Sequence, residues 1–383
     1  PSNQDHESAS RPTSKVRGVR VIDDNGPGRH LPSLTSFRWI AASLVFVCHV
    51  QGVLVRHDGW FQRVSEQGLV GVSFFFVLSG FVLTLRCRAD DTFGAFIQRR
   101  IARIYPAYAV VAVLALPVIW AIGEIRRPRH VLQALLPLTL LQSWVPHEAI
   151  AFSGNRVAWS LSCEAFFYAM FPMLIRWVRP MAVGRIWRLL GGSMASSLLI
   201  AVVLHPTDGS TAWNLLYANP LLRFPEFVTG VALAALHRSG VRIPWIRLGP
   251  AVAFAAVSFA GAGWAPTYLQ PYVVTLVPIS VLLVAAAQAD VEGATPRVLR
   301  SRAMLRLGQW SFAFYLVHEL ILRSLRHAAR GWQVVWSAAV AYLGSIVVAA
   351  LVFHFVEQPL ERRLRRRPIA TMWRSGRVKE RPA

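Results

Sequence analysis

LTSFRWIAASLVFVCHV, at residues 34–50, is an apolar stretch of helix length that contains one arginine and one histidine. Arg38 and His49 are eleven residues apart, so on a helix they share nearly one face and lie about 16 Å apart along the axis. An ionisable side chain at membrane depth costs roughly 2.5 kcal/mol or more and usually faces a protein interior or a water-filled cavity. His49 is therefore a candidate site residue. The alternative is that Arg38 extends to the membrane surface and His49 only hydrogen-bonds a neighbouring helix.

The composition of the 383-residue chain is that of an integral membrane protein. Hydrophobic residues make up 54% of it, charged residues only 16%, and the mean hydropathy is +0.42, which is too apolar for an ordinary soluble enzyme of this length. The net charge of +22 comes almost wholly from arginines that separate the apolar segments. This pattern indicates that basic residues are concentrated in cytoplasmic loops, and it does not indicate a nucleic-acid partner. The three cysteines have no metal-ligand spacing, so no metal site is predicted.

Apolar segments predict ten membrane-spanning helices. They lie at residues 35–54, 68–86, 102–122, 157–176, 187–204, 212–236, 247–264, 269–288, 306–325 and 333–355. Residues 131–144 are too short to span and contain Pro137, which favours a re-entrant or interfacial segment. We expect a disordered cytoplasmic tail without a signal peptide at residues 1–33, the membrane domain at 34–360 and a basic cytoplasmic tail at 361–383.

The distribution of basic residues predicts the orientation. With both termini in the cytoplasm, 30 of the 41 basic residues fall on the inner side and nine on the outer side. The predicted fold class is thus an all-α integral membrane protein with about ten transmembrane helices and both termini cytoplasmic, located in the cell membrane. The role of Arg126, Arg127 and Arg129, on one outer loop, stays open apart from contact with an anionic headgroup or substrate.

Three ionisable side chains fall at one predicted depth. His49 is about 14 residues from the inner end of the first helix, Glu164 about 7 from the outer end of the fourth, and His318 about 12 from the inner end of the ninth. At 1.5 Å per residue all three converge in the outer half of the bilayer. One shared site is expected there, with His318 among the substrate-binding candidates.

Several longer motifs follow in order along the chain. They are GLVGVSFFFVLSGFVLT at 68–84, QRRIARIYPAY at 98–108, WSLSCEAFFYAMFP at 159–172, RFPEFVTG at 223–230, SFAFYLVH at 311–318 and VEQPLERR at 356–363. Together with the Arg-x10-His spacing of the first helix, this succession resembles the membrane-bound acyltransferase-3 family over about residues 34–366.

The resemblance implies transfer of an acyl group from cytoplasmic acyl-coenzyme A, acetyl or longer, to a hydroxyl, with His49 as the base. The residue type fits, because a hydroxyl is a poor nucleophile until a base takes its proton and an imidazole suits that task near neutral pH. Glu164 is expected to orient the imidazole of His49 and to stabilise its charged form. The alternative partner of Glu164 is Arg223.

Further candidates are expected to bind the donor. Arg100 and Arg103 are three residues apart at the inner end of the third helix, and guanidinium groups suit the phosphates of coenzyme A, although both could be plain topology signals. Arg38 is expected to contact the pyrophosphate or pantetheine part. Ser79 is a candidate hydrogen-bond donor to the thioester oxygen, with close packing at Ser79 and Gly80 as the alternative.

One ion pair and one cysteine have more modest expected roles. Arg223 and Glu226 are three apart in a proline-flanked helix, which predicts an internal ion pair that supports the substrate site. Cys163, beside Glu164, has no basic neighbour in sequence to activate it, so we expect a packing residue. Direct transfer and an acyl-enzyme intermediate both stay open.

The predicted function is that of a stand-alone O-acyltransferase, because the hydrolase-like domain of some family members is not expected here. The resemblance favours an acceptor hydroxyl on a sugar-bearing small molecule such as a macrolide-type antibiotic, in a bacterium; O-acetylation of a cell-surface polysaccharide is the alternative. The alternative from a different class is an exporter of a hydrophobic compound. The sequence counts against it, because it shows no repeated pair of broken helices. The expected partners are the lipid bilayer, the donor and the acceptor; a homo-oligomer stays open.

Overall fold

A computed structural model gives the arrangement of the chain and describes residues 31–55, 59–88, 91–121, 133, 135–204, 215–266, 269, 274–326 and 333–366. Within these residues all regular secondary structure is helical. Arg126, Arg127 and Arg129 lie outside the described residues, as do most of the two predicted tails. The first described helix begins at Pro32 and the last described helix ends at Arg366; the predicted bounds of the membrane domain stay predictions.

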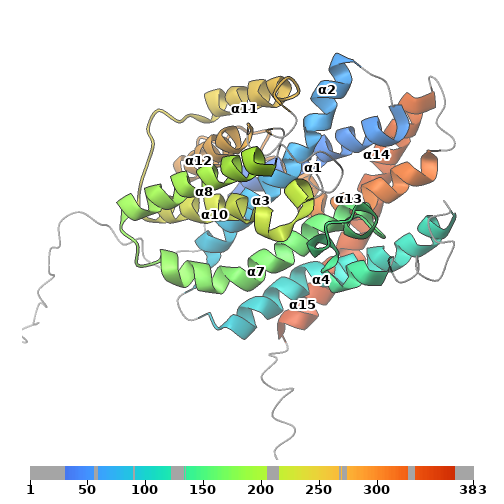
Figure 1. Cartoon of the computed structure of the whole chain (residues 1–383), viewed down its shortest axis with the longest axis horizontal. Coiled ribbons are helices and arrows are strands. Elements are labelled where there is room, and N and C mark those ends of the chain that lie inside the picture. Colours follow the sequence, from blue (N-terminus) through green and yellow to red (C-terminus); the bar gives the residue numbers. More distant parts are fainter. Residues whose placement is uncertain are drawn as a thin grey trace, which may run out of the picture.

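Among the described residues, ten long helices occupy the positions predicted for the ten spans (Figure 1). They are α1 (Pro32–Val50), α3 (Val70–Arg86), α4 (Phe93–Ala121), α7 (Trp159–Val178), α8 (Val183–Leu204), α10 (Pro220–Arg238), α11 (Leu248–Ala262), α12 (Leu276–Glu292), α13 (Arg302–Leu325) and α14 (Gln333–Val352). Local sequence fixes several of their starts. Asn219 caps α10 by accepting hydrogen bonds from the amides of Leu221 and Leu222, and Ser301 caps α13 by accepting one from Met304.

Six segments are long and apolar enough to cross a membrane. They are Pro32–Leu54, Trp60–Arg86, Phe93–Ala121, Arg156–Val178, Val183–Leu204 and Gln333–Arg365. The chain is therefore a multi-pass membrane protein. Helices α11 and α12 are shorter, with 15 and 17 residues, while α10 and α13 carry buried charged residues within the bundle. The count of ten spans and the cytoplasmic placement of both termini stay predictions.

The segment before α7 contains no long helix in its described part. It consists of 3-10 turns at Leu136–Thr139, Gln142–Trp144 and Arg156–Ala158 and the four-residue α6 (Glu148–Ala151). Two buried side chains attach it to the start of α7: Gln142 donates to the carbonyl of Ala158, and Ser143 donates to that of Trp159, both at 3.0 Å. This agrees with a segment too short to span, although its depth in a membrane stays a prediction.

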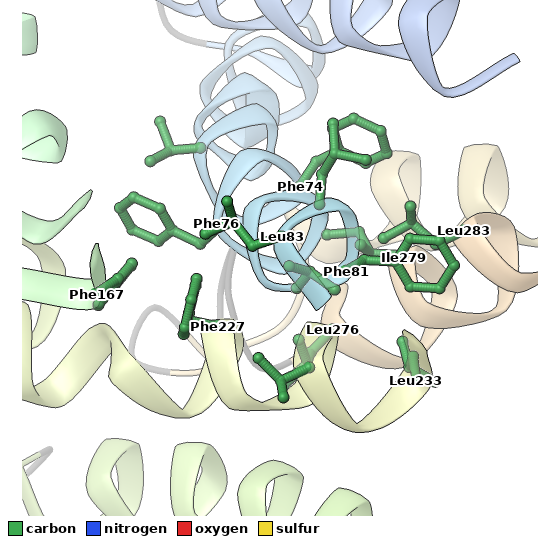
Figure 2. Close-up of a cluster of buried hydrophobic side chains, with 14 of the residues drawn as sticks. Phe74, Phe76, Phe81, Leu83, Phe167, Phe227, Leu233, Leu276, Ile279 and Leu283 are labelled. Atoms are coloured by element: carbon green, nitrogen blue, oxygen red, sulfur yellow. The ribbon is translucent and has the colours of Figure 1, made fainter. Parts of the chain in front are cut away.

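Helix α3 crosses the middle of the bundle and packs on α1, α10 and α12 (Figure 1). Figure 2 shows its aromatic side chains, among them Phe76 and Phe81, surrounded by residues of α7, α10 and α12. The contact with α10 depends on two glycines. A Cβ atom on Gly80 would lie 2.1 Å from the carbonyl oxygen of Phe227, and one on Gly230 would lie 1.9 Å from that of Val77. Close packing at Gly80, the alternative for the Ser79-Gly80 pair, is therefore present.

The last described helix folds back onto the start of α4. Helix α14 continues through a π-helical turn, Phe353–Glu357, into α15 (Gln358–Arg366), which lies beside α4 at the lower edge of Figure 1. Gln98 of α4 donates a 2.8 Å hydrogen bond to the carbonyl of Leu364. This contact brings the acidic residues of the last turn and of α15 next to the arginines of α4.

Candidate active site

Most of the predicted site residues fall into three groups. The histidine pair is His49 and His318; the arginine cluster is Arg38, Arg100 and Arg103 around Glu164; the Arg223 cluster is Ser73, Arg223 and Glu226. Helices α1 and α13 supply the first group, α1, α4 and α7 the second, and α3 and α10 the third.

The histidine pair is joined by a direct hydrogen bond. Nδ1 of His49 lies 3.0 Å from Nε2 of His318, and Nδ1 of His318 lies 3.2 Å from the carbonyl oxygen of Phe314. A carbonyl oxygen only accepts hydrogen bonds, so Nδ1 of His318 carries the hydrogen and, in the neutral ring, Nε2 is the acceptor. Nδ1 of His49 then donates to it. This assignment leaves Nε2 of His49 with a lone pair that can take a proton.

Packing holds the two imidazoles in place. His318 is fully buried and stacks on Phe314 with 5.7 Å between ring centroids, whereas His49 is half-buried. Asn155, just before α7, donates a 2.8 Å hydrogen bond to the carbonyl of Leu316 and so ties this segment to α13. Arg156 interacts electrostatically with His49. The residues before α7 therefore lie close to the more accessible histidine.

The arginine cluster contains a half-buried carboxylate, which is hydrogen-bonded to a phenol. Glu164 interacts electrostatically with three arginines, Arg38, Arg100 and Arg103. Tyr168, one helical turn after Glu164 on α7, donates a 2.8 Å hydrogen bond to its Oε2 atom. The hydroxyl of Ser79 interacts with the hydroxyl of Tyr168. Four of the residues predicted to bind the donor thus lie near one another.

The three arginines of this cluster are not equivalent. Nη1 of Arg103 lies 3.2 Å from Glu357 and 3.0 Å from Glu361, so this guanidinium is engaged with the π-helical turn and α15. Neither Arg38 nor Arg100 forms an ion pair with any carboxylate of the described residues. Arg100 lies over the ring of Phe96, 5.7 Å from its centroid, and its buried Nε atom has no hydrogen-bond partner among them. Arg38 and Arg100 are therefore the cations available to an anionic ligand.

The partner of His49 differs from the one expected from sequence. We expected Glu164 to orient His49, but the structure pairs His49 with His318 and Glu164 with Tyr168. The alternative partner of Glu164, Arg223, is bonded to Glu226 instead. The expectation rested on matched depths counted along separate helices, and depth does not fix the direction in which a side chain points from its helix.

The Arg223 cluster is a buried polar network within an aromatic environment. Nη2 of Arg223 donates to Ser73 at 3.0 Å and to Glu226 at 3.1 Å, and Ser73 donates to the same carboxylate at 3.2 Å. The guanidinium also lies over three rings, at 5.3 to 5.8 Å from the centroids of Phe76, Trp159 and Tyr217. The predicted internal pair of Arg223 and Glu226 is confirmed. Its contacts join α3 to α10.

Two residues bonded to the arginine cluster were not predicted from the sequence. Tyr168 follows Glu164 by four residues, a spacing that places both on one helix face and could have indicated it. Glu357 belongs to the VEQP motif, and its carboxylate is buried in a π-helical turn, a feature frequent at functional sites. Cys163 is buried and donates to the carbonyl of Ala218 at 3.3 Å, as a packing residue does.

No three acidic, histidine or cysteine side chains come together as a metal site in the part of the chain that the structure describes. The polar groups that could act chemically are the histidine pair, toward one end of α1, and the arginine cluster, toward the other end of the same face of α1. Along α1, Arg38 and His49 are about 16 Å apart.

Comparison with known proteins covers most of the chain. The family model of the acyltransferase-3 type, described as "Acyltransferase domain", matches residues 31–355. The chain is 37% identical to acyltransferase MdmB of Streptomyces mycarofaciens, over 89% of this chain and 94% of that protein. It is 27% identical to exopolysaccharide production protein ExoZ of Rhizobium meliloti (strain 1021), over 82% of this chain and 95% of that protein.

A third relative is named for its reaction. The chain is 22% identical to peptidoglycan O-acetyltransferase OatA of Listeria monocytogenes serovar 1/2a, over 87% of this chain and 56% of that protein. No solved structure matches the chain.

Proposed function

This chain belongs to the acyltransferase-3 family and is a membrane acyltransferase, and we propose that it moves an acyl group from acyl-coenzyme A to a hydroxyl with His49 as the general base. The observation that carries this proposal is the 3.0 Å hydrogen bond between His49 and His318, together with the bond from His318 to the carbonyl of Phe314. These two bonds favour the tautomer of His49 whose Nε2 atom accepts a proton.

The proposed reaction is a direct transfer. Nε2 of His49 takes the proton of the acceptor hydroxyl while the hydroxyl oxygen attacks the thioester carbonyl. The new C–O bond forms and the C–S bond breaks. The leaving sulfur then takes the proton from the imidazolium. The products are an ester and the free thiol of coenzyme A. His318 keeps the ring of His49 oriented by accepting the hydrogen bond from Nδ1.

The donor is proposed to enter from the cytoplasm at the arginine cluster. Arg38 and Arg100 are half-buried and form no ion pair with a described carboxylate, which suits binding of phosphate groups. Arg103 is engaged with Glu357 and Glu361, so we assign it to holding α15 in place. The rise of about 16 Å along α1 between Arg38 and His49 is then spanned by the pantetheine arm and the acyl group. Ser79 and Tyr168 are proposed to contact that arm.

The proposed acceptor is a hydroxyl on a sugar-bearing small molecule such as a macrolide-type antibiotic. The 37% identity to acyltransferase MdmB, over nearly the whole of both chains, supports this choice together with the resemblance of the motifs. A cell-surface polysaccharide is the second candidate, supported by the similarity to ExoZ and OatA. Membership of an acyltransferase family leaves the exporter alternative without support.

The test uses purified full-length protein in lipid nanodiscs. Acetyl-, propionyl- and butyryl-coenzyme A are offered with a macrolide or with a short oligosaccharide, and the ester is detected by mass spectrometry. We expect ester from wild type and from His354→Ala, a control that removes an exposed histidine, and on the order of 10² to 10⁴ times less from His49→Ala. Absence of ester with every coenzyme A thioester would contradict the proposal that acyl-coenzyme A is the donor. Normal turnover by His49→Ala would contradict the base.

A further inference from the structure

A groove lies next to the arginine cluster, at the ends of α3, α4 and α7 that our topology places in the cytoplasm. It has a volume of about 450 Å³. Its lining is basic and aromatic and includes Arg88, Arg176, Arg179, Asp91, Phe93 and Phe96. None of these residues belongs to the site predicted from sequence.

The charges of this groove are unevenly engaged. Asp91 is neutralised by Arg99 at 2.7 Å, and Arg179 donates to the carbonyl of Arg88 at 2.6 Å, which holds one rim together. Arg88 and Arg176 are exposed and form no ion pair with a described residue. The groove thus presents two free guanidinium groups, and such groups bind phosphate by charge-assisted, forked hydrogen bonds.

An aromatic surface accompanies these charges. The ring of Phe93 is 58% exposed although it lies at the start of a helix that packs into the bundle. Phe96, one turn further along α4, is buried and stacks on Phe171 of α7 with 5.2 Å between centroids. An exposed flat ring beside phosphate-binding groups suits a purine base, which stacks on aromatic side chains.

The groove and the arginine cluster lie along the same faces of two helices. On α4, Phe93, Phe96 and Arg100 follow at spacings of three and four, so they share one face over about 10 Å. On α7, Phe171, Tyr168 and Glu164 follow at the same spacings in the opposite direction. The two faces meet where Phe96 stacks on Phe171, and Arg100 lies over the same Phe96 ring.

We propose that this groove binds the adenosine 3′-phosphate end of the acyl-coenzyme A donor, with Arg88 and Arg176 on the 3′-phosphate and Phe93 on the adenine. The inference rests on the proposed function, because it assumes a nucleotide-bearing donor. The pyrophosphate then lies at Arg38 and Arg100, and the pantetheine arm continues past Tyr168 toward His49. In this arrangement the groove supplies affinity for the nucleotide, and the arginine cluster holds the start of the pantetheine arm.

The test compares donors that differ only in the nucleotide: acetyl-coenzyme A, its 3′-dephospho form and acetyl-pantetheine. We expect Arg88→Ala/Arg176→Ala to raise the KM for acetyl-coenzyme A about tenfold or more, since two charge-assisted contacts are lost. The ratio of kcat/KM between acetyl-coenzyme A and acetyl-pantetheine should fall by the same factor. Arg88→Lys/Arg176→Lys should recover part of it. Arg185→Ala/Arg188→Ala, which removes two exposed arginines of α8 outside the groove, is the matched control.

A binding measurement separates this proposal from the proposed function. Calorimetry with adenosine 3′,5′-bisphosphate should detect binding to wild type and to the control, and a clear loss in Arg88→Ala/Arg176→Ala. An unchanged ratio of kcat/KM between acetyl-coenzyme A and acetyl-pantetheine would overturn the groove assignment while leaving acyl transfer intact. So would equal bisphosphate affinity in wild type and Arg88→Ala/Arg176→Ala. Activity of the double variant that instead follows the anionic phospholipid content of the nanodisc would assign the groove to a lipid headgroup and also overturn it. Absence of transfer from every donor, with bisphosphate binding retained, would reject the proposed function alone.

Discussion

His318 accepts a hydrogen bond from His49 across two helices whose sequences are 269 residues apart, at an N–N distance of 3.0 Å. The ring of His318 is itself oriented by the carbonyl of Phe314, at 3.2 Å. A neutral imidazole in this position fixes the ring of His49 without placing a second charge beside it. This distinguishes the pair from a histidine–carboxylate pair, in which the carboxylate also stabilises the imidazolium.

The first prediction concerns His318 as a positioning residue. His318→Phe removes the hydrogen-bond acceptor and should lower kcat by about ten- to a hundredfold with little change in the KM of the donor, because the ring of His49 loses one of the hydrogen bonds that orient it. His318→Gln offers an amide oxygen in the same region and should recover part of the loss. Steady-state kinetics on both variants provide the measurement. Equal kcat values for the two variants would show that the hydrogen bond itself does not matter.

The second prediction separates Glu164 from the histidine pair. Because Glu164 bonds Tyr168 and lies among the arginines, Glu164→Gln should act mainly on the KM of acyl-coenzyme A and on its salt dependence. Combined with His318→Phe, its effect on kcat/KM should be additive within about 0.5 kcal/mol, as for sites without shared partners. A coupling energy above about 1 kcal/mol would instead place both residues in one unit.

The third prediction distinguishes Arg103 from Arg100 by stability. Arg103→Gln leaves the buried carboxylate of Glu357 without its ion-pair partner and should destabilise the protein by about 1 to 3 kcal/mol. Arg100→Gln should weaken binding of the donor with little change in melting temperature, because Arg100 forms no ion pair with a described carboxylate. Adding Glu357→Gln to Arg103→Gln should restore part of the lost stability. Thermal unfolding in detergent, followed by intrinsic fluorescence, reports all four proteins, and equal melting temperatures of Arg100→Gln and Arg103→Gln would refute the distinction.

The fourth prediction concerns the contact between α3 and α10. Gly80→Ala places a methyl group against the backbone of α10, which must separate the helices and should destabilise by about 1 to 3 kcal/mol. Gly192→Ala is the matched control, since no atom lies within 4 Å of a Cβ atom built there, and alanine favours the helix by about 1 kcal/mol. Size-exclusion profiles and melting temperatures of the two variants provide the comparison. Wild-type stability of Gly80→Ala would show that the helices can move apart without loss.

The positions of the helices followed from the sequence alone. The apolar segments predicted ten helices, and long helices lie at all ten positions among the described residues, because hydropathy and helix punctuation are properties of the local chain. The pairing of Arg223 with Glu226 was likewise predictable, since residues three apart on a helix are neighbours whatever surrounds them. The family also followed, because its motifs are short and occur in a fixed order.

The partners across helices were decided only by the tertiary structure. Depth along the bilayer placed His49, Glu164 and His318 at one level, yet His49 bonds His318 and Glu164 bonds Tyr168. Arg103 likewise reaches Glu361, 258 residues away in sequence, because α15 folds back onto α4. A hydropathy pattern gives the length and depth of a helix, but its rotation about its own axis and its choice of neighbours depend on how side chains interlock and how closely glycines let backbones approach.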